Sequence, residues 1–301
     1  MIFLLRHNYC YMTFRDQFLH FLKGALMRNV LGLATAFLMA SATAASATTI
    51  LFNDFSSTAG LTLNGNAATA VDDSLRNVLR VTPASGSKSG SAFSTSAVTL
   101  NTNVSFSTKF RFNFNHQGNG GADGLVFVVQ TVSNSVGGLG GGIGYAGLGN
   151  SVGVEFDNWN NGGGDGNNDN HVGIDINGNM SSVARSDAPG FTLDSGTDLV
   201  AWVDYNGATD LLEVRLNNSD TRPLLALLSY TVDLTTVLGS TNAFVGFTSG
   251  TGAAWANHDV ISWEFRDTFA PVDVPTETPA PAALGLLGVG LIGMGLMRRR
   301  R

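Results

Sequence analysis

One stretch, residues 104–114, constrains the fold of this chain more than any other. Apolar side chains, four of them phenylalanine, alternate there with Ser, Lys, Arg and Asn. Such alternation requires an extended strand with one buried face and one face in water. Shorter apolar runs, bounded by Gly, Asn, Asp or Ser, recur at 78–81, 125–129, 152–156, 172–176, 199–205, 211–216, 225–232, 243–247 and 260–265. Many short strands without helical periodicity between them predict an all-β, antiparallel β-sandwich with an ample core.

The charge distribution excludes some partners. Of the 17 Lys and Arg residues, four lie in residues 1–47 and four in 298–301, so nine remain in residues 48–297. The same segment holds 22 of the 23 acids, a net charge of −13. Such a surface repels nucleic acid and anionic lipid. The single cysteine, Cys10, permits no intramolecular disulfide.

Residues 152–177 carry the pattern that is most informative about function. Two apolar, strand-like ends flank a loop rich in Asp, Asn and Gly. Alternate side chains of a strand share a face, so Glu155 and Asp157 project together, while Val154 and Phe156 point to the opposite, apolar side. Two carboxylates on one face repel each other unless a positive charge lies between them.

The loop adds further acids and supplies no cationic side chain. Asp165, Asp169 and His171 follow, and residues 152–180 contain no Lys or Arg. A divalent cation would supply the missing charge. Carboxylate and amide oxygens suit Ca²⁺, whereas the imidazole suits a transition ion such as Mn²⁺. The alternative is a solvated loop with incidental acids.

These residues resemble the metal-binding signature of the legume-type (L-type) lectins. The resemblance rests on Glu155-Phe-Asp157-x-Trp159-x-Asn161, Asp165, His171 and Gly173-Ile-Asp175. With the Ala-Asp-Gly at 122–124 and later strand and loop sequences, it covers about residues 50–268. It implies a jelly-roll sandwich of the concanavalin A-like type.

The resemblance also implies two metal ions. A transition ion, Mn²⁺ or another, would bind Glu155, Asp157, Asp165 and His171. Calcium would bind Asp157, the Trp159 carbonyl, Asn161 and Asp165. Asp165 and His171 stand one residue further apart than in the plant lectins. Either Asp169 replaces Asp165, or His171 is displaced.

A carbohydrate site follows from the same resemblance. Asp123, after a cis peptide bond, would hydrogen-bond sugar hydroxyls beside Asn161, and the Trp159 ring would offer an apolar platform. A glycine of the run 136–144, Gly141 or Gly142, would donate its N–H. The loop 252–257, with Ala253 and Ala254, would border the sugar. His116 and His258 are expected to be surface or turn residues without a role.

The ends of the chain indicate export. Residues 1–47 form a leader, in which Met27, an apolar run and small residues up to Ala47 are typical of a secretory signal peptide; translation is expected to start at Met27. An N-terminal membrane anchor is the alternative. The lectin-like domain is assigned to residues 48–270.

A tripartite C-terminal segment follows. Residues 271–281 form a Pro-rich linker, and residues 282–301 form a hydrophobic transmembrane helix ending in four arginines. This tail resembles the PEP-CTERM sorting signal of Gram-negative bacteria, with Pro-Ala-Pro in place of Pro-Glu-Pro. It implies transient insertion in the inner membrane, processing by an exosortase, and delivery to the cell surface or the exopolysaccharide matrix. A permanent anchor is the alternative.

Three functions are compatible with the sequence. The favoured one is a non-enzymatic, metal-dependent lectin that binds carbohydrate or exopolysaccharide. The second is a structural matrix protein that keeps the fold without a sugar site. The third is a glycoside hydrolase with Glu-x-Asp-x-x-Glu on one strand, but Asn160 occupies the last position of that pattern, and metal-bound acids cannot serve as the proton donor.

Overall fold

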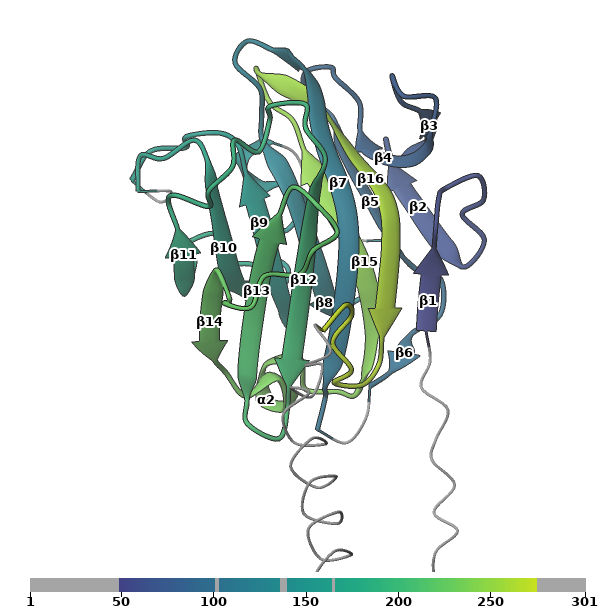
Figure 1. The fold of residues 1–301 in the computed structure, drawn as a ribbon, viewed down its shortest axis with the longest axis vertical. Coiled ribbons are helices and arrows are strands. Elements are labelled where there is room, and N and C mark those ends of the chain that lie inside the picture. Colours follow the sequence, from purple (N-terminus) through teal and green to yellow (C-terminus); the bar gives the residue numbers. More distant parts are fainter. Residues whose placement is uncertain (1–48, 101–102, 136–139, 164–165, 275–301) are drawn as a thin grey trace, which may run out of the picture. The chain divides into compact units, whose positions relative to one another are not determined.

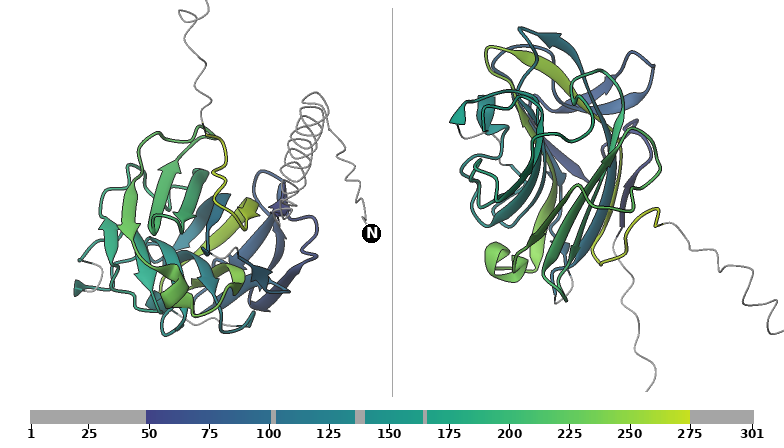
Figure 2. Two further views of the ribbon diagram at one scale, coloured as in Figure 1. Left: turned by 90° about the horizontal axis from the view of Figure 1, so that it is seen from below. Right: turned by 60° about the vertical axis from the view of Figure 1, so that its left-hand side comes forward.

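The computed structural model describes residues 49–100, 103–135, 140–163 and 166–274. Within these residues the chain forms two antiparallel sheets packed face to face, as the right-hand view of Figure 2 shows. The predicted all-β jelly-roll sandwich is confirmed. The leader, most of the Pro-rich linker and the C-terminal segment 282–301 lie outside the described residues. No helix in the described ranges is long and apolar enough to cross a membrane.

The back sheet includes the long alternating stretch near its centre (Figure 1). Its strands, in spatial order, are β14 (Leu228–Thr231), β13 (Leu211–Asn217), β12 (Leu199–Asn206), β7 (Phe106–Gly118), β16 (Trp255–Arg266), β4 (Asn77–Thr82) and β3 (Ala68–Val71), with β1 (Thr49–Phe52) also paired to β16.

The front sheet carries the acidic stretch on two adjacent strands. Its order is β11 (Ala184–Ser186), β10 (His171–Ile176), β9 (Ser151–Asp157), β8 (Gly124–Gln130), β15 (Asn242–Gly250), β5 (Ser89–Ser94) and β2 (Leu61–Gly65), with β6 (Val98–Thr99) also paired to β15. Two short helical turns complete the secondary structure, η1 (Gly140–Gly142) and α2 (Leu234–Leu238).

The core lies between the sheets and is rich in aromatic rings. The Phe110 ring of β7 lies 5.7 Å from Phe156 of β9 and 5.1 Å from Phe247 of β15, both edge to face. All three side chains are fully buried. Burying one such side chain contributes roughly 1.5–3 kcal/mol. The alternation within residues 104–114 therefore fixes which face of β7 meets the front sheet.

Three parts of the secondary structure differ from the sequence prediction. The apolar run at 225–232 forms a strand only from Leu228, and the Leu225 side chain is 84% exposed. Helix α2 was not predicted; the Asp233 side chain caps it by accepting a hydrogen bond from Thr236 N–H at 3.1 Å. A run of five residues is too short to show helical periodicity. The strands that apolar runs did not predict are β1, β2, β3, β5, β6 and β11.

Residues 267–274 lie across the outer face of the back sheet, and we call them the C-terminal strap. Val272 of the strap buries the ring of Trp202, which is 0% exposed although it points away from the core. Lys109 Nζ lies 2.6 Å from Asp273 and 5.7 Å from the centroid of the Trp202 ring. The strap therefore covers apolar surface of the back sheet.

The first strand starts and the last strand ends at the same end of the sandwich. Thr49 pairs with Arg266, so the first strand begins where the last one finishes. Gly124 opens β8, Asp157 ends β9 and His171 opens β10 at the opposite end, the upper end in Figure 1. The loops of the acidic stretch therefore lie about the length of a strand away from Thr49 and Arg266.

Candidate metal and carbohydrate site

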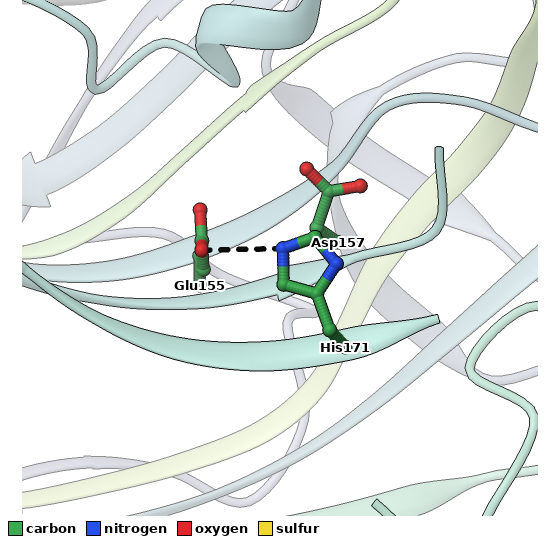
Figure 3. Close-up of side chains that lie close together, drawn as sticks. All are labelled: Glu155, Asp157 and His171. Atoms are coloured by element: carbon green, nitrogen blue, oxygen red, sulfur yellow. Dashed lines mark ion pairs between the residues drawn. The ribbon is translucent and has the colours of Figure 1, made fainter. Parts of the chain in front are cut away.

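The register of β9 and β10 brings three predicted ligands together (Figure 3). Glu155 pairs with Gly173, and Asp157 pairs with His171, so Glu155, Asp157 and His171 share the face opposite the core. All three are buried, each 1% exposed. Their ligand atoms lie within 4.8 Å of one another. Two ligands of one ion, each about 2.0–2.4 Å from it, lie no more than about 4.8 Å apart, so this donor set fits a divalent cation.

Glu155 is held from two directions. His171 Nε2 lies 3.3 Å from its Oε1, and Ser182 Oγ donates a 2.6 Å hydrogen bond to the same oxygen. A Cβ at Gly173 would lie closer than 3.0 Å to both Glu155 Oε1 and Ser182 Oγ. Only glycine at position 173 leaves space for this carboxylate and its hydroxyl partner.

Asp157 connects the triad to the loop that follows. Its Oδ1 accepts a 2.7 Å hydrogen bond from Trp159 N–H, which makes an Asx turn at the end of β9. The chain then turns toward Asn161, which is exposed. Of the remaining predicted ligands, Asp165 lies outside the described residues, and Asp169 is exposed and is not part of the triad.

Asp175 places a further acid beside the triad. It lies two residues after Gly173 on the same face of β10 and is 0% exposed. Burial, and then the neighbouring negative charge of Glu155, raise the pKa of Asp175 well above its ordinary value. In the described part of the chain, no Lys or Arg forms an ion pair with Glu155 or Asp175. Among the described residues, these two carboxylates therefore have no Lys or Arg partner, and a metal ion would supply the missing positive charge.

Asp123 lies next to the triad through the pairing of Gly124 with Asp157. The Ala122–Asp123 peptide bond is cis, as the resemblance implies. Asp123 N–H donates to the Gly250 carbonyl at 3.1 Å, and its own carbonyl accepts from Asn158 N–H at 3.2 Å. Asp123 is 3% exposed. These backbone bonds connect its position to both neighbouring strands.

The glycine run contacts the same loop at Gly141. A Cβ at Gly141 would lie closer than 3.0 Å to the side-chain amide of Asn161, whereas one at Gly142 would approach Ala146 instead. The structure thus places Gly141, of the two candidates, against Asn161. Both belong to the turn η1.

The remaining predicted sugar contacts border Asp123. A Cβ at Gly120 would lie 3.4 Å from the half-buried Trp159 ring, and one at Gly252 would lie 3.6 Å from Asp123 Oδ2. Ala253 is exposed and its carbonyl accepts a 2.8 Å hydrogen bond from Asn119, whereas Ala254 is buried.

Sequence reasoning left two residues of the site without a role and misplaced one histidine. Ser182 approaches Glu155 from a separate segment, so no spacing in the sequence indicates the contact. Asp175 belongs to the signature on which the resemblance rests but was given no role, although period two places it on the face of His171. His258, expected at the surface or in a turn, is 0% exposed, whereas His116 is exposed beside Asp73 at 2.8 Å.

Comparison with known proteins gives one family. A model described as Legume lectin domain matches residues 47–281. The L-type lectin-domain containing receptor kinase VIII.1 of Arabidopsis thaliana is 34% identical over 151 residues, 48% of this chain and 21% of that protein. The probable receptor kinase S.7 of the same plant is 32% identical over 167 residues, 50% of this chain and 24% of that protein. The chain thus spans about a fifth to a quarter of these relatives.

Solved structures are similar over nearly their whole length. The metal-free lectin I-B4 from Griffonia simplicifolia is 26% identical, with a TM-score of 0.60, over 72% of this chain and 98% of that chain. The Bauhinia forficata lectin in complex with GalNAc is 25% identical, with a TM-score of 0.62, over 73% and 98%. Basic winged bean lectin with Tn-antigen is 28% identical, with a TM-score of 0.60, over 73% and 98%.

Proposed function

The chain belongs to the legume lectin domain family, and on this premise we propose that it is a non-enzymatic, metal-dependent lectin that binds carbohydrate beside Asp123. One observation carries the proposal. The pairing of Gly124 with Asp157 sets Asp123 next to the Glu155, Asp157 and His171 triad. Residues suited to a sugar and residues suited to a metal thus meet at one end of the front sheet.

Carboxylate, imidazole, amide and carbonyl groups from the end of β9 to the start of β10 would bind the two metal ions. Glu155, Asp157 and His171 would hold a transition ion, with Asp165, and calcium would share Asp157 and Asp165 and add Asn161 and the Trp159 carbonyl. The ions would neutralise the buried carboxylates and fix the loop after β9. Asp157, which already accepts from Trp159 N–H at 2.7 Å, connects the strand to that loop.

Sugar recognition would use the groups around Asp123. A carboxylate accepts hydrogen bonds from sugar hydroxyls, the Asn161 amide donates, and the Trp159 ring offers an apolar face to the C–H side of a pyranose. Gly141 is the glycine whose backbone N–H we assign to the sugar, because it is the one that lies against Asn161. Ala253 and Ala254 belong to the loop that borders the site.

The environment of Glu155 argues against hydrolysis. Its Oε1 contacts Ser182 Oγ and His171 Nε2, and Asn160 stands where a second catalytic acid is required. A retaining mechanism needs one protonated carboxyl and one ionised carboxyl on opposite sides of the sugar bond. Carboxylates that hold a metal ion would stay ionised, so Glu155 and Asp157 would not supply the proton donor.

We also propose that the protein is exported and displayed on the cell surface or in the exopolysaccharide matrix. The signal-like segment before residue 48 and the PEP-CTERM-like tail support this, with an exosortase as processing partner and the inner membrane as a transient location. The strand ends support the same proposal. Arg266, the last residue of β16, lies at the end of the sandwich opposite Asp123, so the Asp123 end would stay accessible to carbohydrate.

The test is glycan-array binding by the purified full chain, displayed multivalently, because a single site binds monosaccharides weakly. Binding is measured with Ca²⁺ and Mn²⁺, after chelation, and in Asp123→Ala. Leu51→Ala, an exposed position of β1 at the opposite end of the sandwich, is a control substitution outside the site. Binding that chelation and Asp123→Ala both abolish supports a metal-dependent lectin. A chain that Ca²⁺ stabilises but that binds no glycan is a structural matrix protein instead.

A further inference from the structure

Three polar side chains cross the apolar interior beneath Asp123. His258 of β16 and Thr82 of β4 come from the back sheet, where they are register partners, and Ser249 of β15 comes from the front sheet. All three are 0% exposed. Buried polar groups cost free energy unless they are hydrogen-bonded, so this row requires partners.

Each hydrogen bond of this row is donated in the same direction, from His258 toward the Gly124 carbonyl. Ser249 Oγ lies 2.6 Å from the Gly124 carbonyl, which only accepts, so the Ser249 hydroxyl donates there. Thr82 Oγ1 lies 2.7 Å from Ser249 Oγ and therefore donates to it. His258 Nδ1 lies 2.7 Å from Thr82 Oγ1 and must supply the proton of the third bond. This order requires a proton on Nδ1 of His258.

The surroundings of His258 agree with a neutral ring. The ring packs edge to face on Phe114, with 4.6 Å between centroids, and Nε2 is buried without a hydrogen-bond partner in the described part of the chain. Burial lowers the pKa of His258 to about 3. The row therefore keeps the same proton order across the physiological pH range.

The row ends at the residue that follows Asp123. Two backbone bonds already hold Asp123, one to Gly250 and one from Asn158, and the Ser249 hydroxyl adds a third restraint at the Gly124 carbonyl. A carbohydrate site gains affinity when its polar groups are fixed before the ligand arrives.

We propose that His258, Thr82 and Ser249 form a positioning relay that fixes the Asp123–Gly124 turn from the back sheet and thereby sets carbohydrate affinity without touching the sugar. The part that concerns affinity rests on the proposed function. The relay itself concerns only the backbone of Asp123 and Gly124.

The first test is amide hydrogen exchange of the full chain in Thr82→Val, which keeps the shape of the side chain and removes its hydroxyl. We expect exchange at the Asp123 and Asn158 amides to accelerate about tenfold relative to Val203 of β12, because one buried hydrogen bond restrains the turn. Thr82→Ser, which keeps the hydroxyl, should restore slow exchange. Ser249→Ala removes only the final donor and answers the same question should Thr82→Val not fold. Acceleration at Val203 equal to that at Asp123 overturns the relay.

Nitrogen NMR of the His258 ring is the second test, because it shows which ring nitrogen carries the proton. A purely structural role for His258 would not require the proton on a particular nitrogen. The relay requires the proton on Nδ1, and a proton on Nε2 overturns it.

Affinity is then measured for a glycan that the wild-type chain binds on the array, together with Ca²⁺ affinity. We expect Thr82→Val to weaken glycan binding about tenfold and to leave Ca²⁺ binding unchanged. Unchanged glycan affinity overturns the role in binding. A wild-type chain that binds no glycan refutes the proposed function, and exchange and tautomer still decide the relay.

Discussion

Replacing Gly173 by alanine should weaken metal binding about 100-fold while the sandwich still folds. The added Cβ would lie closer than 3.0 Å to Glu155 Oε1 and Ser182 Oγ, so the carboxylate has to leave its position. Forcing one extra carbon into a packed site costs roughly 1–3 kcal/mol of stability whether or not metal is present. The informative quantity is therefore the increase in stability that the metal produces, not stability itself.

The size of that increase follows from linkage. At a free metal concentration of 100 times the wild-type Kd, a bound ion stabilises the fold by about 2.7 kcal/mol. Disturbing a ligand or its support weakens metal affinity by roughly 10–100-fold, and a 100-fold loss leaves a gain of only about 0.4 kcal/mol. The difference of about 2.3 kcal/mol corresponds to about 5–9 °C in Tm for a domain of this size.

Thermal unfolding with Ca²⁺ plus Mn²⁺, and with chelator, measures this difference directly. Gly149→Ala is the matched control, because a Cβ there meets nothing within 4 Å. We expect the control to show the wild-type metal-induced shift and Gly173→Ala to show almost none. An equal shift in the two variants would refute the assignment of Glu155 as a metal ligand.

Three further changes test other parts of the structure. Burial lowers the pKa of His258 from an ordinary value of 6.5 to about 3, so below pH 6.5 the unfolded chain takes up a proton that the folded chain does not. The free energy of unfolding should therefore fall by about 2 kcal/mol between pH 7 and pH 5. Urea unfolding of His258→Phe should lack that part of the pH dependence. Gly141→Ala, whose Cβ would collide with Asn161, should weaken glycan binding on the array and leave the Mn²⁺ affinity, measured by calorimetry, within about twofold of wild type. Phe110→Ala, between the two sheets, should cost about 3–5 kcal/mol in urea unfolding, and a loss below 1 kcal/mol would contradict its place in the core.

Much of the candidate site was accessible from local sequence. Period two on a strand places Glu155 and Asp157 on one face, and the same rule places His171 and Asp175 together on the next strand. Those rules say nothing about which strands pair. The approach of Ser182 to Glu155, and of Gly141 to Asn161, depends on segments that are separate in the chain, so no local pattern contains them.

Burial likewise depended on tertiary structure. The exposed His116 and the buried His258 have similar polar neighbours in sequence, and only packing between the sheets separates them. Trp202 shows the same limit, because alternation points it outward and the C-terminal strap then buries it. A strap of eight residues carries no periodic signal of its own.

The sequence by itself determined that the chain forms a two-layer antiparallel sandwich and that acidic side chains share one face of the strand at 152–157. Both depend on alternation between neighbours, which is local. The tertiary structure alone decided the register that pairs Gly124 with Asp157 and the polar row from His258 to Gly124. Register and contacts between sheets are fixed by how all the strands pack together, and the free energy of that packing is shared among residues far apart in the chain.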